Sequence, residues 1–390
     1  CAPAAPVWRR AFSTFISGVR QATLVGLGTL LHTVVLSSMS APLVSIILPI
    51  HNGDMWIDEC LEALLCQTVL HAEASSADPA PPACRLELSA YDDGSSDGSW
   101  DSLQRWKPRL EAAGVAVVIG RSGGSQGGGC GFAKNRAVAQ SSGTWLCFQD
   151  VDDLSRPKRI EAQLLAAAAR PGALVGARVS REPEGSTARY VAWANEMSEE
   201  ELLLHRFREC TLLMPTWFMA RGTFVRGGGF REEKCEDLLF LHAHVARGGS
   251  LHRVGGSPLV VYRYHAAAVT HATPRALLLR HRTAALEAAV LSAHPSWARF
   301  TIWGAGRDGR DFFKAMSEDG KRRVAAFCDV DPKKIGSKYI YEAHRVPIVH
   351  FREAQPPFVL CVALGRTGGA FEANVTSLGL REGLDYYHFC

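Results

Sequence analysis

The sequence lacks the marks of several protein classes. Its 390 residues include 11 cysteines, an odd number, and no two of them form a C-x-x-C pair. This cysteine usage argues against a disulfide framework and against a zinc ribbon. Cys147 and Cys328 stand in apolar runs, which fits buried thiols in a reducing compartment. The net charge of +4 permits a polyanionic partner without requiring one. With 47% apolar and 21% charged residues, the chain is typical of a globular protein.

The N-terminal stretch lacks acidic residues and a membrane-length apolar run. Residues 1–53 contain no Asp or Glu, and the apolar run over residues 22–36 is shorter than the roughly 20 residues that a spanning helix needs. Three interpretations compete: a mitochondrial presequence, a membrane anchor, or a dispensable leader before a domain that starts near Ala41. We expect a leader over residues 1–40, no stable membrane insertion and a cytoplasmic protein. A mitochondrial or secretory location is the alternative if the leader is a targeting segment.

The stretch richest in chemistry is residues 143–153, GTWLCFQDVDD. An apolar run typical of a buried strand stops abruptly in three carboxylates spaced D-x-D-D. Open α/β sheets bind ligands at the C-terminal ends of their strands, and carboxylates this close repel one another unless a hard cation such as Mg²⁺ or Mn²⁺ takes up the charge. The spacing therefore points to a metal site that clamps phosphate oxygens. A solvated acidic turn is the alternative.

Short apolar runs alternate with helical patterns from Leu43 onward, which indicates an α/β protein. Repeated strand–helix–strand order predicts a parallel sheet with right-handed crossovers, and the polar clusters follow the strands. One helical linker over residues 274–297 is expected to lead into a second α/β unit that opens with a strand at 300–303. The other predicted strands are 43–48, 86–91, 115–119 and the one with Trp145, and predicted helices include 56–65, 132–140 and 159–169.

Seven segments resemble, in order, the successive signatures of family 2 glycosyltransferases. That family shares the GT-A fold, in which a nucleotide-binding α/β half joins an acceptor-binding half. The resemblance implies a GT-A domain over residues 41–272, a helical linker over 273–298 and a small Rossmann-like α/β domain over 299–390. The segments are VSIILPIHN (44–52), DDGSSDGS (92–99), AKN (133–135), FQDVDD (148–153), GGF (228–230), EDL (236–238) and YRYH (262–265).

The resemblance implies roles for residues near the nucleotide. Asp93, with Asp92 as a second candidate, matches the carboxylate that accepts a hydrogen bond from uracil, a task suited to an acceptor-only side chain. Asp97 is expected only to stabilise its turn. Pro49 and His51 match residues that line the base pocket, although Pro49 also suits the end of a strand.

Metal and catalytic roles follow from the same resemblance. Asp152 matches the ligand that holds a metal against the diphosphate, and Asp150, which is placed near the ribose, and His265 are further candidate ligands. A lone His is more often structural, so both readings of His265 stay open. Asp237 matches the base that takes a proton from the acceptor hydroxyl, with Glu236 orienting it. An acidic pair at a helix start also complements the helix dipole.

Three further features leave alternatives open. Lys134 stands where the family usually has Arg, which implies a point-charge contact to the nucleotide. Trp217 either stacks on the acceptor or belongs to the core. The loop 304–309 fits a G-x-G-x-x-G fingerprint with an acid, Asp329, about twenty residues on. No hydride-transfer partner is visible, so we expect a structural or RNA-contacting domain and not an NAD site.

Within the family, the resemblance is greatest to vertebrate enzymes that modify queuosine in tRNA, and it continues beyond residue 299. It implies an inverting, metal-dependent hexosyltransferase that moves galactose from UDP-galactose to queuosine-containing tRNA, with Mn²⁺ or Mg²⁺ as cofactor. The alternatives are a β-1,3-N-acetylglucosaminyltransferase acting on a glycan and a non-catalytic nucleotide-sugar-fold binding protein. An RNA acceptor requires a positive surface. The candidates for it are Arg275, Arg280, Arg282, Arg299, Arg307 and Arg310.

Overall fold

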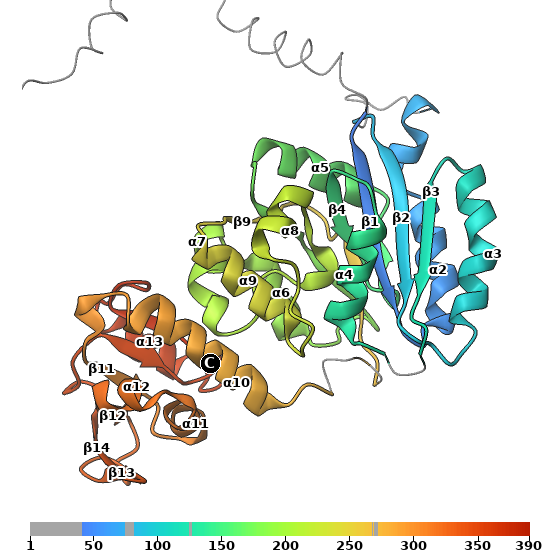
Figure 1. Ribbon diagram of the computed structural model, residues 1–390. Coiled ribbons are helices and arrows are strands. Elements are labelled where there is room, and N and C mark those ends of the chain that lie inside the picture. The colour runs from blue at the N-terminus through green and yellow to red at the C-terminus, as the bar shows by residue number, and fades with distance from the viewer. Residues whose placement is uncertain (1–40, 75–81, 125–126, 267, 269–271) are drawn as a thin grey trace, which may run out of the picture. The chain divides into compact units, whose positions relative to one another are not determined.

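The computed structural model describes residues 41–74, 82–124, 127–266, 268 and 272–390. Within the compact unit Leu43–Cys390, two large sheets each have their own hydrophobic core (Figure 1). The predicted leader over residues 1–40 lies outside the described residues. In the part of the chain that is described, no helix is long and apolar enough to cross a membrane.

The N-terminal sheet has seven strands in the order β3-β2-β1-β4-β8-β6-β9. The first four strands of the chain run parallel, as predicted, so their C-terminal ends share one edge. β8 runs antiparallel to β4 and β6, which the sequence pattern did not indicate. The strands are β1 (Leu43–Ile50), β2 (Arg85–Asp92), β3 (Ala116–Arg121), β4 (Trp145–Phe148), β6 (Leu174–Ala177), β8 (Phe218–Ala220) and β9 (Leu251–Val254).

Helices cover both faces of this sheet. Ile46 and Leu48 of β1 share a core cluster with residues of α2 and α3, whereas Ile47 packs with residues of α4 on the other face. Successive side chains of a strand point to opposite faces, so a strand covered on both faces is a continuous apolar run. The helices of this domain are α2 (Asp54–Leu65), α3 (Ser99–Ala112), α4 (Cys130–Gln140), α5 (Arg159–Ala169), α6 (Ala188–Glu196), α7 (Glu199–Leu204), α8 (Arg221–Gly227) and α9 (Glu236–Ala246).

A three-stranded sheet, β5-β10-β7, returns the chain to the end of β4. β10 pairs antiparallel with β5, which directly follows the D-x-D-D segment, and parallel with β7. The residues after β10 therefore come back beside the carboxylates that precede β5. The strands are β5 (Leu154–Ser155), β7 (Val179–Glu182) and β10 (Val260–Arg263).

The segment that joins the two large sheets is helical over most of its length, although it is not one continuous helix. α10 (Arg275–Leu286) passes into a π-helical turn at Glu287–Leu291, and a 3-10 helix follows at Pro295–Trp297. His294, before the proline, has extended backbone angles of φ −117° and ψ 122°. Proline lacks an N–H and disfavours helical geometry in the preceding residue, so the helix ends before it.

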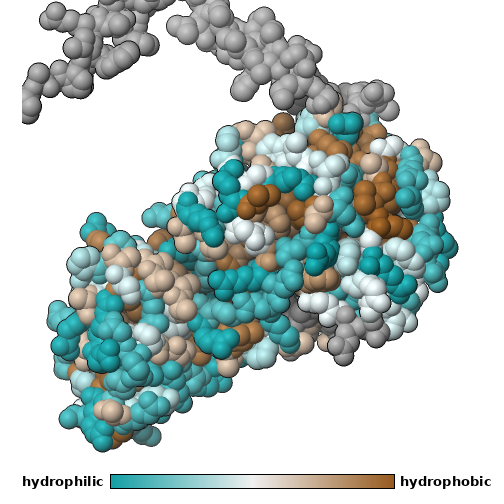
Figure 2. All heavy atoms as spheres, in the orientation of Figure 1, coloured by the Kyte–Doolittle hydropathy of each residue, from teal (hydrophilic) through white to brown (hydrophobic). Residues whose placement is uncertain are grey.

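The C-terminal sheet has the order β13-β14-β12-β11-β15-β16, and its strand pairs are parallel except for β13 with β14. The predicted strand at 300–303 is present. On the face shown in Figure 2, hydrophilic residues cover most of this domain, whereas hydrophobic residues gather in patches on the N-terminal domain. The elements are β11 (Phe300–Trp303), α11 (Arg307–Ala315), α12 (Glu318–Arg323), β12 (Val324–Asp329), β13 (Lys338–Tyr341), β14 (His344–His350), β15 (Phe358–Leu360), α13 (Ala370–Thr376) and β16 (Tyr386–His388).

Candidate active site

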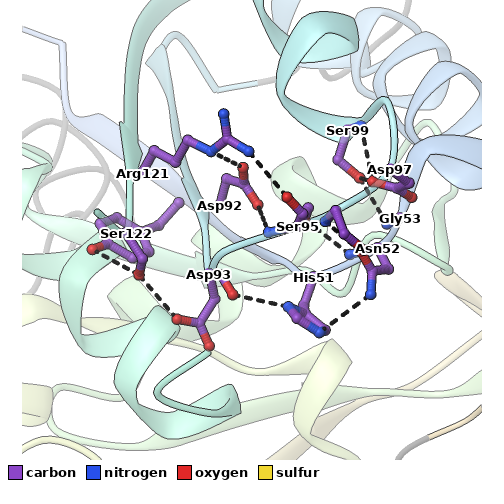
Figure 3. A network of polar contacts seen from close by, with 12 residues as sticks. His51, Asn52, Gly53, Asp92, Asp93, Ser95, Asp97, Ser99, Arg121 and Ser122 are labelled. Carbon is purple, nitrogen blue, oxygen red and sulfur yellow. Dashed lines mark hydrogen bonds and ion pairs between the residues drawn. The ribbon is translucent and has the colours of Figure 1, made fainter. Parts of the chain in front are cut away.

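Two polar turns meet where β1 and β2 end, and Figure 3 shows their contacts. Asp92 Oδ1 accepts a hydrogen bond from Ser95 N at 2.9 Å, and Asp92 Oδ2 lies 2.9 Å from Arg121 Nε. Asp92 is 0% exposed. A nucleotide cannot touch a carboxylate that has no exposed surface, so the structure corrects the prediction that Asp92 contacts the base. Its carboxylate instead fixes the turn after β2 against the end of β3.

Asp93 faces the glycine-rich loop that precedes α4. Its carboxylate accepts hydrogen bonds from the backbone N–H groups of Gly128 at 2.9 Å and Gly129 at 2.8 Å, and from Ser122 Oγ at 3.1 Å. The exposed side chain of His51 places Nδ1 2.8 Å from the Asp93 carbonyl oxygen (Figure 3). The Asp93 carboxylate is 3% exposed and already accepts these three bonds, so the exposed imidazole of His51 is the more open of the two groups toward a uracil ring. The nucleotide roles of Asp93 and His51 stay predictions.

Asp97 has the turn-stabilising role that the sequence predicts. Its Oδ1 accepts a hydrogen bond from Ser99 N at 3.0 Å, and its Oδ2 accepts one from Asp54 N at 3.1 Å. These bonds fix the start of α3 and the start of α2 against each other. Pro49 is buried within β1, in register with Tyr91 of β2, and its place in the base pocket stays a prediction.

Three carboxylates gather directly after β4. One oxygen from each of Asp150, Asp152 and Asp153 lies within 4.8 Å of the others. Asp153 is 0% exposed, and its Oδ1 accepts a hydrogen bond from the backbone N–H of Arg263 at 2.9 Å. Asp153 therefore ties β10 to this turn, and the more accessible carboxylates of Asp150 and Asp152 remain to face a ligand.

The acidic turn has the chemistry of a divalent-cation site. Asp150 Oδ1 is buried without a hydrogen-bond partner. Burial raises the pKa of Asp150 to about 7; the Lys134 ammonium opposes that rise, and the charge of Asp152 adds to it. A hard cation would remove both the desolvation cost and the repulsion, and carboxylate oxygens are the ligands that Mg²⁺ and Mn²⁺ prefer. The residues present thus fit the metal that the sequence predicts.

His265 stands at this turn, although 113 positions separate it from Asp152. Its Nε2 lies 2.9 Å from Asp152 Oδ2. The ring of Trp56 lies against it with the two centroids 5.2 Å apart, and the Arg263 guanidinium lies 4.9 Å from the Trp56 ring centroid. Imidazole nitrogen is a common metal ligand, so this position supports the metal reading of His265. Trp56 and Arg263 were not predicted here, because neither carries a spacing signal of its own.

A buried arginine supports the metal turn from behind. Arg159, the first residue of α5, is 0% exposed. Its guanidinium donates to the backbone carbonyl of Phe148 at 2.6 Å, to that of Pro215 at 2.7 Å and to Gln149 Oε1 at 2.5 Å. Helical periodicity placed α5 correctly but gave no sign that its first charged side chain points inward.

Replacing Arg159 by Met should destabilise the fold strongly. The change leaves buried carbonyl groups without donors, and each such group costs about 1–3 kcal/mol, so we expect the free energy of unfolding to fall by about 2–4 kcal/mol. The midpoint of urea unfolding measures this loss. Arg170→Met is the matched control, because the Arg170 side chain is 46% exposed and its nearest acidic oxygen, on Glu199, is 3.8 Å away. Equal midpoints for the two variants would contradict the supporting role.

Lys134 and Glu236 form a buried ion pair between α4 and α9. Lys134 Nζ lies 2.8 Å from Glu236 Oε1, and the Lys134 side chain is 1% exposed. The structure therefore corrects two predictions. The Lys134 ammonium has no surface from which to contact a nucleotide. The Glu236 carboxylate binds Lys134, so its effect on Asp237 is exerted from within this ion pair and not through a hydrogen bond of its own to that carboxylate.

Asp237 has the protonation behaviour of a candidate base. Burial raises the pKa of its carboxyl group to about 6, the charge of Glu236 adds to the rise, and Lys134 opposes it. Its Oδ1 accepts a hydrogen bond from the N–H of Leu238 at 2.7 Å. The ideal pKa of a base lies close to the operating pH, so this carboxylate suits proton abstraction near neutrality. The assignment of Asp237 as the base stays a prediction.

Trp217 belongs to the core, so its placement on the acceptor side was wrong. The side chain is 0% exposed, and its Nε1 donates to the carbonyl of Leu212 at 2.8 Å. Its ring packs against Phe230 and Phe240 at centroid distances of 6.1 and 5.5 Å. A ring enclosed in this way has no face left for a sugar or a base.

The G-x-G-x-x-G loop has the shape of a dinucleotide fingerprint but not its free acid. Asp329 Oδ2 accepts a hydrogen bond from Ala305 N at 2.9 Å and lies 3.0 Å from Lys334 Nζ. Asp308, in the first turn of α11, adds negative charge where a diphosphate would sit, and it pairs with Arg275 at 2.8 Å. These contacts favour the structural interpretation, because the acid that would bind a ribose is already engaged.

Two of the six arginines predicted to form a positive surface are held by partners within the chain. Arg275 pairs with Asp308 and also with Asp311 at 2.7 Å. Arg282 donates to the backbone carbonyl groups of Phe207 and Phe389. Guanidinium groups held in this way contribute little to phosphate binding, so the idea of one face built from all six arginines is not supported.

The sheet order and the acidic turn after β4 fit the GT-A fold. Residues 45–226 match the family model described as "Glycosyl transferase family 2". Among solved structures, S. aureus TarS 1–349 in complex with UDP-GlcNAc matches with a TM-score of 0.50 and 14% identity, over 72% of this chain and 84% of that one. At this identity the likeness concerns the fold.

Curated relatives match over shorter stretches. The chain is 34% identical over 110 residues to the poly(ribitol-phosphate) beta-glucosyltransferase of Bacillus spizizenii, which is 28% of this chain and 15% of that protein. It is 25% identical over 214 residues to glycosyltransferase AglE of Haloferax volcanii, which is 54% of this chain and 60% of that protein. The matches thus span less than two thirds of these relatives' own lengths.

Proposed function

We propose that this protein is an inverting, metal-dependent glycosyltransferase that moves a hexose from a UDP-sugar onto an acceptor hydroxyl. The observation that carries the proposal is the contact of His265 with Asp152 at the acidic turn, together with the half-buried carboxylate of Asp237, whose charge acts on Asp150. The family match of residues 45–226 supports the reaction class. Asp150, Asp152 and His265 are the residues that would hold Mn²⁺ or Mg²⁺.

The proposed reaction is a single displacement. The acceptor oxygen forms a bond to the anomeric carbon of the sugar as the bond from that carbon to the UDP oxygen breaks, and the hydroxyl proton passes to the Asp237 carboxylate. No enzyme nucleophile is needed, because one in-line step inverts the configuration. When bound, the cation offsets the negative charge that develops on the departing diphosphate. Desolvation of the half-buried Asp237 carboxyl group raises its pKa to about 6, which suits a base that acts near neutral pH.

The pH dependence of the rate should report the Asp237 carboxyl group. The base acts in its deprotonated form, and its pKa is about 6. We therefore expect kcat/KM to be constant above that pH and to fall about tenfold per pH unit below it. The profile is measured at saturating Mn²⁺, which keeps the metal turn loaded, and UDP affinity over the same pH range is the control. A rate that rises as the pH falls from 7 to 5 would contradict the assignment.

For the particular substrates, we propose UDP-galactose as the donor and queuosine in tRNA as the acceptor. The support is the sequence resemblance to the vertebrate queuosine-tRNA galactosyltransferase, which extends from the GT-A signatures into the C-terminal domain. The test is transfer of labelled galactose from UDP-galactose to queuosine-containing tRNA, with tRNA that carries unmodified guanosine at that position as the control. Transfer to a glycan acceptor from UDP-N-acetylglucosamine, with none to tRNA, would overturn the substrate assignment and keep the reaction class.

A further inference from the structure

One face of α4 packs against the segment that precedes α9, the helix that carries Asp237. Gly131, Lys134 and Asn135 are spaced i, i+3 and i+4, so they share that face. Asn135 Nδ2 donates to the Phe230 carbonyl at 2.8 Å, and Phe230 N donates to Asn135 Oδ1 at 3.0 Å. A Cβ atom on Gly131 would lie only 2.5 Å from the carbonyl oxygen of Arg231. The two segments are therefore packed at a distance that only glycine permits.

The ion pair completes this contact at the first residue of α9. Lys134 Nζ and Glu236 Oε1 are 2.8 Å apart, and the Glu236 side chain is only 12% exposed. A buried pair adds little net stability, because desolvation of both charges offsets their attraction. The effect of the pair is geometric, because each buried charge is stable only when the other lies beside it, and this holds α4 and α9 in one relative position. The AKN and EDL segments, about one hundred positions apart in the sequence, thus meet in one junction.

We propose that Lys134 is a positioning residue: through Glu236 it fixes the start of α9 and, with it, the carboxylate of Asp237. Lys134 touches neither donor nor acceptor in this arrangement. The Lys134 ammonium interacts electrostatically with two groups of carboxylates: Asp150 of the metal turn and Glu236 of α9. This inference rests on the proposed role of Asp237 as the base.

Several charges act on Asp237, and they come from different elements. Glu236 on α9 and Glu209, ahead of β8, disfavour its ionised form, whereas Lys134 on α4 favours it. Asp150 at the metal turn interacts with it through space, as do the thiols of Cys210 and Cys235. Of these groups, Lys134 alone is cationic. Its removal and the removal of Glu236 should therefore move the titration of Asp237 in opposite directions.

The experiment measures the Asp237 carboxyl directly in the full chain, without substrate. Protein labelled with carboxyl ¹³C-aspartate is titrated by NMR, and Asp237→Asn identifies the signal by its loss. We expect Lys134→Met to raise the Asp237 midpoint by at least about one pH unit, because an opposite charge close by lowers a carboxyl pKa by about 1–3 units. Glu236→Gln should lower the midpoint, and Lys134→Met with Glu236→Gln should lie between the two.

Two variants separate the electrostatic and geometric effects from general damage. Lys134→Arg keeps the cation and should keep the midpoint close to that of the wild type. Lys321→Met is the matched control, because Lys321 is a comparably buried lysine, 7% exposed, paired with Glu318 in the C-terminal domain. It should leave the Asp237 midpoint unchanged. If the proposed transferase activity is present, the pH below which kcat/KM falls should shift in each variant in the same direction as the NMR midpoint of Asp237.

The outcomes distinguish this inference from the proposed function. Midpoints that do not move in Lys134→Met and Glu236→Gln, or that move in the same direction, would overturn the positioning role whatever the activity. Opposite shifts in a protein that transfers no sugar would support the positioning role and sink the transferase assignment. Opposite shifts together with a moving acid limb would support both.

Discussion

Replacing Asp237 by Asn should lower the rate of sugar transfer about 10²–10⁴-fold while UDP binding persists. Asparagine has the same shape but cannot take the proton of an attacking hydroxyl, and a positioned general base contributes a factor of this size. The loss corresponds to about 3–5 kcal/mol of transition-state stabilisation. Burial raises the pKa of Asp237 to about 6. Removing its ionisable group therefore takes a destabilising charge out of the folded protein at neutral pH, and the variant should fold.

The measurement for Asp237→Asn is kcat/KM at pH 8, where the wild-type carboxylate is ionised. Calorimetric titration with UDP and Mn²⁺ shows whether the nucleotide half of the site is intact. Asp331→Asn is the control, because that side chain is 36% exposed in the C-terminal domain, lies 3.6 Å from Lys334 Nζ and accepts a hydrogen bond from Lys333 N that asparagine can also accept. Should Asp237→Asn keep more than about a tenth of the wild-type rate, another group must take the proton.

Replacing Asp152 by Asn should weaken Mn²⁺ binding by more than about 100-fold and remove transfer with it. Loss of a hydrogen-bond partner behind a ligand already costs about 10–100-fold in metal affinity, so loss of a ligand's charge should cost more. Asp152 is also the contact of His265 at 2.9 Å, so its replacement affects two of the proposed ligands. Magnesium should follow the same pattern at higher concentration.

Metal binding can be followed without any sugar transfer. Electron paramagnetic resonance counts free Mn²⁺, and a cation that binds the folded state raises its stability by about 2.7 kcal/mol when its concentration is 100 times the dissociation constant. Wild type should therefore melt at a higher temperature with Mn²⁺, and Asp152→Asn should not. Trp56→Phe keeps an aromatic ring against His265 and should retain binding. A normal Mn²⁺ affinity in Asp152→Asn would place the metal site elsewhere.

Several elements could be read directly from local sequence. α5 spans Arg159–Ala169 and β11 spans Phe300–Trp303, both as predicted, because their apolar spacing is unambiguous. The turn role of Asp97 was also predictable, since its bond to Ser99 N spans only two positions, whereas its bond to Asp54 N depends on the tertiary fold. The interruption of the helical linker before Pro295 also has a local cause, because proline disfavours helical geometry in the residue before it.

Side-chain roles in the candidate site were harder to predict, since they depend on partners far along the chain. Lys134 was expected to meet a nucleotide and instead meets Glu236, 102 positions on. The sequence around Trp217 would look the same whether its ring bound a sugar or packed in the core, and in the structure it packs against Phe230. Strand order and crossover direction decide which side of a residue is covered, and neither is written in the spacing of one segment.

The sequence by itself determined the α/β class, the strand that ends in D-x-D-D and the order of the family signatures, because each depends on neighbours within about ten positions. The tertiary structure alone decided that His265 returns to Asp152, that Lys134 is buried against α9 and that Arg275 and Arg282 are occupied by partners. Parallel strands with long crossovers bring distant segments to one edge, and only the packed chain fixes which charges meet there.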